Sequence, residues 1–206
     1  MPTISSTLSY YDDNAEEIAR GYEEVDMRGV VDRVASHLPP GGRILEIGPG
    51  SGRDAAYLLD RGFDMYAVDG SAPLVTAAVR LHPELDGRLH HGVLPGRLPF
   101  DDETFDGSIS LATLMHLYRG DLPGVFAEIR RVLRQGGVAV ISVSTQRSGL
   151  NDHGDDARGR HFTVLSGDEW ARLMTDAGIT IRTRWDNADV AERAGISWTT
   201  LVGVAE

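Results

Sequence analysis

Ile44-Leu-Glu-Ile-Gly-Pro-Gly-Ser-Gly-Arg-Asp54 is the stretch that decides the fold, because an apolar run passes directly into glycines at positions 48, 50 and 52. A short apolar run bounded by a glycine-rich turn is typical of a buried strand, and the residues after the turn favour a helix. Glycine lets the backbone turn tightly and approach a ligand with no Cβ in the way, while the first amides of the helix point at that ligand. The stretch therefore predicts a strand, a ligand-binding turn and a helix.

A carboxylate follows this turn at the end of the next apolar run. Asp69 stands 21 residues after Gly48, where a carboxylate can accept hydrogen bonds from both hydroxyls of a ribose. A dinucleotide fingerprint, G-x-G-x-x-G, would require glycine at position 53, and this chain has Arg53. The turn and the acid together indicate an adenosine-containing ligand without a pyrophosphate. A nicotinamide-dependent oxidoreductase on a similar fold stays open as an alternative.

Apolar runs and helical patterns alternate along the rest of the chain, which is typical of parallel βαβ units. Seven strands are predicted, over residues 43–48, 65–69, 88–91, 105–111, 138–144, 179–185 and 198–204. Helices are predicted over 52–61, after Ser71, from Asp121 to Gly136-Gly137, and after the capping box Ser166–Glu169. The first forty residues also have a helical pattern, with a break near Gly29, and residues 92–102 and 149–159 are predicted loops.

Composition narrows the classes of function. The chain has 206 residues, no cysteine and a net charge of −11, and all 20 cationic residues are arginine. The absence of lysine excludes a Schiff-base lysine and a P-loop lysine, and an acidic surface repels nucleic acid. The densest arginine cluster, Arg130, Arg131 and Arg134, falls in the last turn of a predicted helix, where cations complement the helix dipole. We therefore expect no nucleic-acid partner.

We expect one domain over residues 1–206, with a helical lid at 1–40 and a Rossmann-like core at 41–206. No run approaches the ~18 apolar residues of a membrane span, and the N-terminus lacks the apolar core of a secretion signal. A cytoplasmic monomer or homodimer without a membrane partner is therefore expected. Asp152, Asp155 and Asp156 lack the spacing of a calcium loop, and the histidines form no HExxH pair, so we expect no metal.

From Tyr10 to about Ser144 the chain resembles class I S-adenosylmethionine-dependent methyltransferases, particularly the small-molecule enzymes with a methyltransferase domain. The matching segments are 10–15 (YYDDNA), 45–54 (LEIGPGSGRD), 67–71 (AVDGS), 98–106 (LPFDDETFD), 110–117 (SLATLMHL) and 128–137 (EIRRVLRQGG). They cover about two-thirds of the chain and occur in family order at family spacing. The tail is also similar to relatives with an R-x-F-T segment, here at 160–163.

This resemblance implies an α/β fold, a Rossmann-like three-layer sandwich around a seven-stranded mixed sheet of order 3-2-1-4-5-7-6 with one antiparallel strand. It implies S-adenosyl-L-methionine as cofactor, S-adenosyl-L-homocysteine as product, and methyl transfer to an O, N or S atom of a small molecule. A macromolecule-directed enzyme or a non-catalytic cofactor-binding module is the alternative. The cofactor-binding positions that it implies are Tyr11, Glu46, Gly48, Gly50, Gly52, Asp69, Gly70, Ser71, Gly92, Val93, Leu94, Ser110 and Leu111.

One of these positions departs from the family pattern. Many relatives carry an acid where this chain has Val93, and that acid accepts a hydrogen bond from the adenine amino group. Adenine recognition is therefore expected to rest on backbone groups, such as those of Val93 and Leu94.

Methyl transfer is an in-line displacement at a sulfonium carbon, so the cofactor supplies the electrophile while the protein aligns the reactants and excludes water. A general base helps only when the acceptor is a hydroxyl or a protonated nitrogen. His116 is the first candidate for that base, followed by His161 and Tyr10, with a packed structural role as the alternative for each.

Three arginines follow the fifth predicted strand, where relatives place contacts to the acceptor. A guanidinium fork at this place would suit a carboxylate or another anionic group. The alternative is that each is a solvated loop charge. The candidates are Arg147, Arg158 and Arg160.

Overall fold

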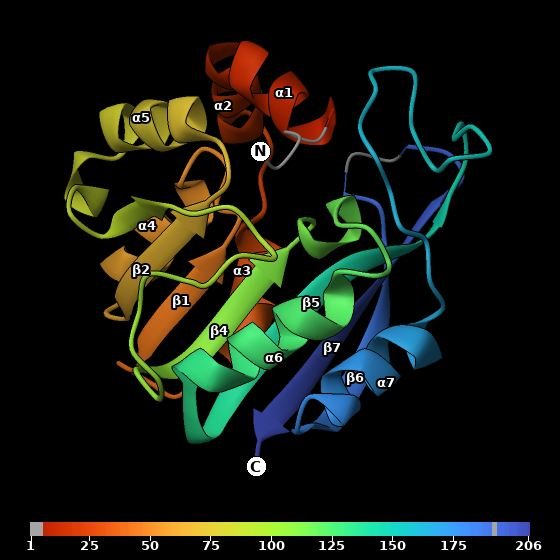
Figure 1. Cartoon of the computed structure of the whole chain (residues 1–206). Coiled ribbons are helices and arrows are strands. Elements are labelled where there is room, and N and C mark those ends of the chain that lie inside the picture. The colour runs from red at the N-terminus through yellow and green to blue at the C-terminus, as the bar shows by residue number, and fades with distance from the viewer. Residues whose placement is uncertain (1–5, 191–192) are drawn as a thin grey trace.

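Seven strands form one mixed sheet in a computed structural model of the chain, which describes residues 6–190 and 193–206 (Figure 1). The strands are β1 (Arg43–Ile47), β2 (Asp64–Asp69), β3 (Leu89–His91), β4 (Phe105–Leu111), β5 (Leu133–Arg147), β6 (Ile179–Ala188) and β7 (Ile196–Ala205). Their order is β3-β2-β1-β4-β5-β7-β6, and β7 runs antiparallel to β5 and β6 while the other pairs are parallel. The expected strand order and its antiparallel strand are confirmed.

Helices connect the strands, as the βα alternation predicts. They are α1 (Ser6–Asp13), α2 (Ala15–Glu23), α3 (Arg28–Ala35), α4 (Arg53–Asp60), α5 (Ala72–Leu81), α6 (Leu122–Val132) and α7 (Gly167–Asp176), with short 3-10 turns η1 (Pro83–Leu85) and η2 (Leu114–His116). Both expected caps are present. The Ser71 hydroxyl accepts a hydrogen bond from the Leu74 amide at 3.3 Å, and Ser166 and Glu169 form a capping box at the start of α7.

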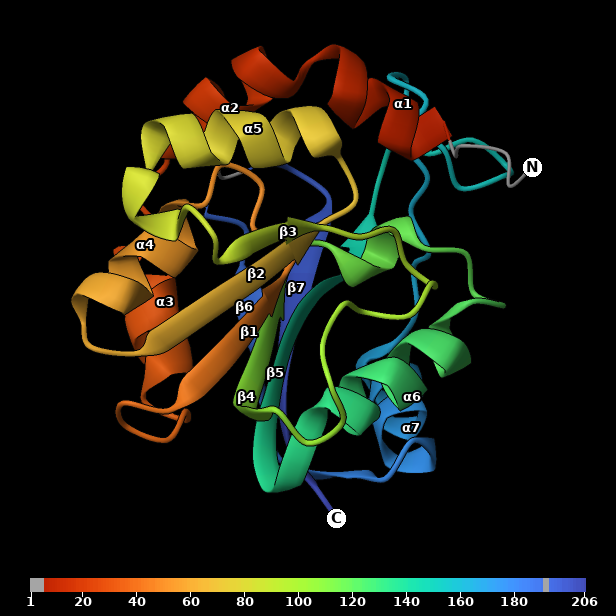
Figure 2. The same cartoon turned by 60° about the vertical axis from the view of Figure 1, so that its left-hand side comes forward.

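Helices cover both faces of the sheet, which makes the three layers visible in Figure 2. On one face Val31 of α3 and Leu58 of α4 are buried against β1 and β2. On the other face Phe126 of α6 and Trp170 of α7 are buried against the central strands. Helices α1 and α2 lie above the carboxyl ends of the strands, and α2 packs on α5. Of the expected N-terminal lid, α1 and α2 cover this edge, whereas α3 belongs to a face of the sheet.

Two predicted boundaries are wrong. The break near Gly29 lies instead at residues 24–27, and Gly29 is inside α3. The guanidinium of Arg53 donates to the carbonyls of Tyr22 and Val25, which gives the backbone after α2 a partner outside the helix. The helix predicted to reach Gly136-Gly137 ends at Val132, because Leu133 is fully buried and pairs with β4 as the first residue of β5.

The arginine cluster around the end of α6 has structural partners. Arg131 donates to Glu128 and Asp102, and Arg130 donates to the carbonyl of Leu133 at 3.1 Å. Arg134 pairs with Asp106 at the start of β4. These contacts tie the helix end to neighbouring loops, as the dipole argument favours.

Candidate functional site

A pocket lies at the carboxyl ends of the central strands, and residues of α1 and α2 form part of its lining. Parallel α/β proteins bind ligands at this edge, where the strand ends and their loops converge. Helix α1 is tied down over the pocket by the loop after β5. The Thr7 hydroxyl accepts a hydrogen bond from the His161 amide at 2.7 Å, and Arg158 donates to the Tyr10 hydroxyl at 3.2 Å.

The glycine turn presents bare backbone to this pocket. Gly48, Gly50 and Gly52 have φ values of +73°, +59° and +82°, a left-handed conformation that favours glycine. A Cβ on Gly48 would lie 2.3 Å from the Thr113 side chain, and a Cβ on Gly50 would lie 2.8 Å from the Tyr22 ring. Both of these glycines line the pocket. Gly52 does not line it, because a Cβ there would meet Leu85 in the core at 2.8 Å.

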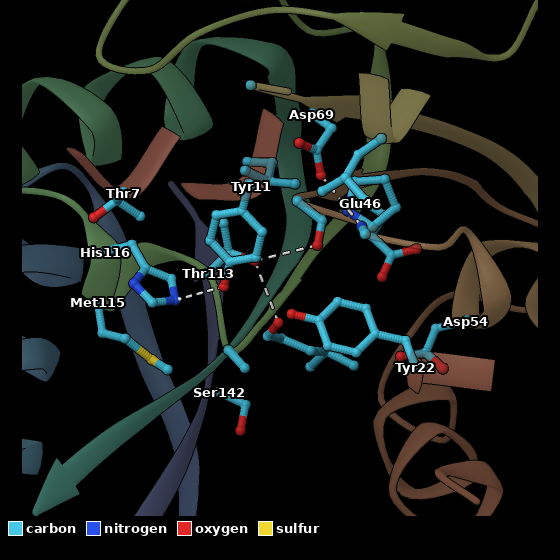
Figure 3. A pocket seen from close by; sticks show the side chains of 18 of the residues that line it. Thr7, Tyr11, Tyr22, Glu46, Asp54, Asp69, Thr113, Met115, His116 and Ser142 are labelled. Atoms are coloured by element: carbon cyan, nitrogen blue, oxygen red, sulfur yellow. Dashed lines mark hydrogen bonds between the residues drawn. The ribbon is translucent and has the colours of Figure 1, made fainter. Parts of the chain in front are cut away.

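Asp69 faces the turn from the end of β2 (Figure 3). Its Oδ2 accepts a hydrogen bond from the Gly50 amide at 3.2 Å, and its Oδ1 accepts one from the Ser71 amide at 2.9 Å. Burial raises the pKa of this carboxyl to about 6, against the effect of the two amides. Each oxygen keeps a lone pair, so the ionised group can accept hydrogen bonds from two ligand hydroxyls.

Glu46 is a second acid at the edge of the turn. Its side chain is 2% exposed, and its Oε2 has no hydrogen-bond partner among the residues that the structure describes. Burial, together with the nearby Asp54 carboxylate, raises its pKa well above the usual range for a glutamic acid. A buried polar atom without a partner costs free energy, which a hydrogen bond from a donor in the pocket would offset.

Tyr11 and His116 form a hydrogen-bonded pair across the pocket (Figure 3). The Nδ1 atom of His116 lies 2.8 Å from the carbonyl oxygen of His161, which can only accept, so Nδ1 carries the proton. In the neutral ring Nε2 is then an acceptor, and it lies 3.1 Å from the Tyr11 hydroxyl. Burial lowers the pKa of His116 to about 4, and the cations Arg160 and Arg147 act in the same direction.

The structure brings most of the sequence-predicted site residues to one pocket. Those that line it are Tyr11, Glu46, Gly48, Gly50, Asp69, Gly70, Gly92, Val93, Leu94, Leu111, His116, Arg147 and Arg160. Val93 is 48% exposed, so its apolar side chain is not needed by the core. The roles assigned to these residues stay predictions.

The remaining predicted site residues lie outside the lining and have partners there. Ser71 caps α5, and the Ser110 hydroxyl donates to the carbonyl of Ile47 at 3.1 Å. The His161 ring lies 3.3 Å from Asp155 and 3.1 Å from the Thr163 hydroxyl. The other members of this group are Tyr10, Gly52 and Arg158.

Several lining residues have no signal in the sequence analysis. Tyr22 follows the helical pattern of α2 and looks like a core position, but its ring stands over Gly50. Asp189 and Arg193 come from the segment between β6 and β7, and Trp198 comes from β7 itself. Strand β6 runs parallel to the central strands, so its carboxyl end reaches the same edge of the sheet. The expected strand order could therefore have predicted that the residues after β6 line the pocket.

Neither a membrane helix nor a metal cluster occurs in the described part of the chain. No helix there is long and apolar enough to cross a bilayer. No three His, Asp or Glu side chains within the same residues are arranged to hold a metal ion.

Comparison with known proteins places this architecture among methyltransferases. Residues 45–141 match the model of the family described as "Methyltransferase domain". The chain is 30% identical over 134 residues to demethylmenaquinone methyltransferase of Beutenbergia cavernae, a match that covers 64% of this chain and 52% of that enzyme. The chain thus spans just over half the length of this curated relative.

Two solved structures share the fold over the whole chain. One is Burkholderia thailandensis 1,6-didemethyltoxoflavin-N1-methyltransferase with bound 1,6-didemethyltoxoflavin and S-adenosylhomocysteine, at a TM-score of 0.80, 21% identity and coverage of 100% of this chain and 92% of that chain. The other is the [4+2]-cyclase SpnF, at a TM-score of 0.76, 17% identity and coverage of 100% and 98%. The expected Rossmann-like fold is confirmed, while the cyclase shows that one fold can carry different reactions.

The hydrogen bonds of His116 predict its state in solution. In NMR spectra that resolve histidine nitrogens, its ring should be neutral with the proton on Nδ1 at pH 6, and should become charged only toward about pH 4. Because the folded pKa lies below the unfolded value of ~6.5, the stability contributed by this neutral ring is lost as the pH falls between them. An imidazolium signal for His116 at pH 6 would contradict the assignment.

Proposed function

We propose that this chain, whose residues 45–141 match the methyltransferase-domain family, methylates an oxygen, nitrogen or sulfur atom of a small molecule. Members of this family use S-adenosylmethionine, so the predicted family, enzyme class and cofactor are confirmed at the level of the family. The observation that carries the proposal is the pocket itself. Bare backbone at Gly48 and Gly50 there faces the carboxyl groups of Glu46 and Asp69.

The residues present fit the cofactor. Asp69 would accept hydrogen bonds from the ribose hydroxyls, and the unpartnered oxygen of Glu46 would accept from a donor on the methionine part. Glycine is needed at 48 and 50 because a Cβ there would collide with Thr113 or with the Tyr22 ring, which both line the pocket. Gly92 and Val93 would lie beside the adenine.

A small acceptor suits the remaining features. Residues of α1 and α2, among them Tyr11 and Tyr22, form part of the pocket lining, so an acceptor has to fit beside these helices. The net charge of −11 opposes binding to nucleic acid. The relatives named above act, by their names, on demethylmenaquinone and on 1,6-didemethyltoxoflavin, both small molecules.

The bound cofactor supplies the methyl group as an electrophile, and the chain aligns the acceptor and keeps water out. When the accepting atom carries a proton, Tyr11 and His116 provide a path for it. The acceptor proton passes to the Tyr11 oxygen as the Tyr11 proton passes to Nε2 of His116. The carbonyl of His161 stabilises the resulting imidazolium through Nδ1. The acceptor thus gains a methyl group and loses a proton.

Ligand selectivity tests the proposed class. S-Adenosylhomocysteine should raise the melting temperature of the protein while NAD leaves it unchanged, because a ligand that binds only the native state stabilises it. A concentration of 100 times Kd should add about 2.7 kcal/mol to the free energy of unfolding. Differential scanning calorimetry provides the measurement. Stabilisation by NAD alone would identify an oxidoreductase and overturn the proposal.

The Asp69 carboxylate gives cofactor binding a predictable pH dependence. Affinity for S-adenosylhomocysteine should fall as the pH drops through about 6, since protonation removes an acceptor from the pocket. Asp69→Asn should weaken binding at pH 7.5 by about tenfold or more, the value of a hydrogen bond to a charged group. It should also remove this pH step.

Isothermal titration calorimetry between pH 5 and 8 measures both effects. Asp60→Asn, at the exposed end of α4, is the matched control. Unchanged affinity in Asp69→Asn, or the same pH step in Asp69→Asn and in wild-type protein, would show that Asp69 does not bind the ribose.

The Tyr11 and His116 pair can be tested by removing one hydroxyl. With a proton-bearing acceptor found by screening for S-adenosylhomocysteine release, Tyr11→Phe should lower kcat by about 100-fold, a typical contribution of general-base catalysis. His116→Gln should have a similar effect, and the double variant should be no worse than either single one. Tyr118→Phe removes an exposed hydroxyl outside the pocket and serves as control. Full activity in Tyr11→Phe would rule out this proton path.

A further inference from the structure

Positive charge gathers in one half of the pocket although the chain is acidic. Arg147, Arg160 and Arg193 line the pocket. They come from the end of β5, the loop that follows it, and the segment before β7, so they lie over the β5-β7-β6 half of the sheet. The glycine turn and Asp69 belong to the other half, after β1 and β2. The arginines therefore line the part of the pocket that the proposed cofactor leaves to the acceptor.

Two of the three arginines are neutralised by neighbouring acids. Asp156 accepts two hydrogen bonds from Arg160, at 2.9 and 2.6 Å, and Asp189 accepts two from Arg193, at 2.9 and 2.7 Å. Arg147 differs from both. Within residues 6–190 and 193–206 its guanidinium has no ion pair and no hydrogen bond.

The Phe162 ring packs against the Arg147 guanidinium and leaves the N–H donors of that group without a hydrogen-bond partner among the described residues. The Cζ atom of Arg147 lies 3.7 Å from the centroid of the Phe162 ring. Burial, together with the neighbouring cations Arg160 and Arg193, lowers the pKa of Arg147. A partly buried guanidinium without a counter-charge costs free energy, which a bound anion offsets. The planar fork of donors matches a carboxylate in two parallel hydrogen bonds.

We propose that the methyl acceptor is a small organic anion whose carboxylate is held by Arg147. The inference rests on the proposed function and deepens it by naming the class of acceptor. One uncompensated cation matches one negative charge, so a carboxylate fits the site better than a phosphate dianion. Phe162 and Trp198 supply apolar wall beside it.

The proposed carboxylate-binding residue, Arg147, lies near the Tyr11 and His116 pair. Phe162 links the two, because its ring centroid lies 3.7 Å from Cζ of Arg147 and 4.5 Å from the centroid of the His116 ring. An acceptor anchored at Arg147 therefore presents a neighbouring hydroxyl or amine to Tyr11. The anchored carboxylate and the methylated atom are separate groups of the same molecule.

Paired probes test the charge requirement. The protein is saturated with S-adenosylhomocysteine, and benzoate and salicylate are each compared with their neutral amides by calorimetry. We expect the carboxylates to bind wild-type protein at least tenfold more tightly than benzamide and salicylamide. Arg147→Gln should lose about tenfold to hundredfold in carboxylate affinity and most of that preference. Arg147→Lys keeps the charge without the fork and should be intermediate.

Controls separate the possible failures. Arg182→Gln removes an exposed guanidinium on β6 and should leave carboxylate binding unchanged. Unaltered affinity for S-adenosylhomocysteine in Arg147→Gln shows that the pocket is intact. If wild-type protein binds S-adenosylhomocysteine but shows no preference for carboxylates, or if Arg147→Gln keeps that preference, the inference is overturned and the proposed function stands. If wild-type protein does not bind S-adenosylhomocysteine, the proposed function itself fails.

Discussion

The site depends on the close approach between the turn after β1 and the end of β2. The Gly50 amide reaches the Asp69 carboxylate only because the backbone at Gly48 and Gly50 is left-handed and carries no Cβ. The pairing of β1 with β2 over residues 43–47 brings the two strand ends to the same level. Backbone and carboxylate therefore form one wall of the pocket.

The ionisable groups of the pocket owe their character to burial. Glu46, Asp69 and His116 are all pushed toward their neutral forms, the acids by raised pKa values and the histidine by a lowered one. Arg147 is the exception, because a guanidinium stays charged even when its pKa is lowered. An acidic chain thus keeps, in the part of the pocket over β5, β7 and β6, a cation that is unpaired among the described residues. This contrast between the overall charge and the local charge is the basis for proposing an anionic acceptor.

Local patterns predicted the strands, the glycine turn and the position of Asp69, because each depends on a short run of sequence, whereas the order of the strands was implied by the resemblance to class I methyltransferases. The caps at Ser71 and Ser166 were predicted for the same reason. Features that depend on distant residues were not: the break after α2 is set by Arg53, and the proton position on His116 is set by a carbonyl 45 residues away. Likewise, the sequence grouped Arg147, Arg158 and Arg160 together, and only their partners distinguish them.

Tyr11 belongs to a helix that also forms part of the pocket lining. The hydroxyl that meets His116 belongs to α1, the same helix that closes the pocket and is tied to the loop after β5 through Thr7. Any movement of α1 that admits a ligand also separates this pair. In the proposed reaction, the cover over the pocket and the proton path would therefore depend on the same placement of α1. A displaced α1 would leave Tyr11 away from His116, and the proposed transfer of the acceptor proton would then have no path.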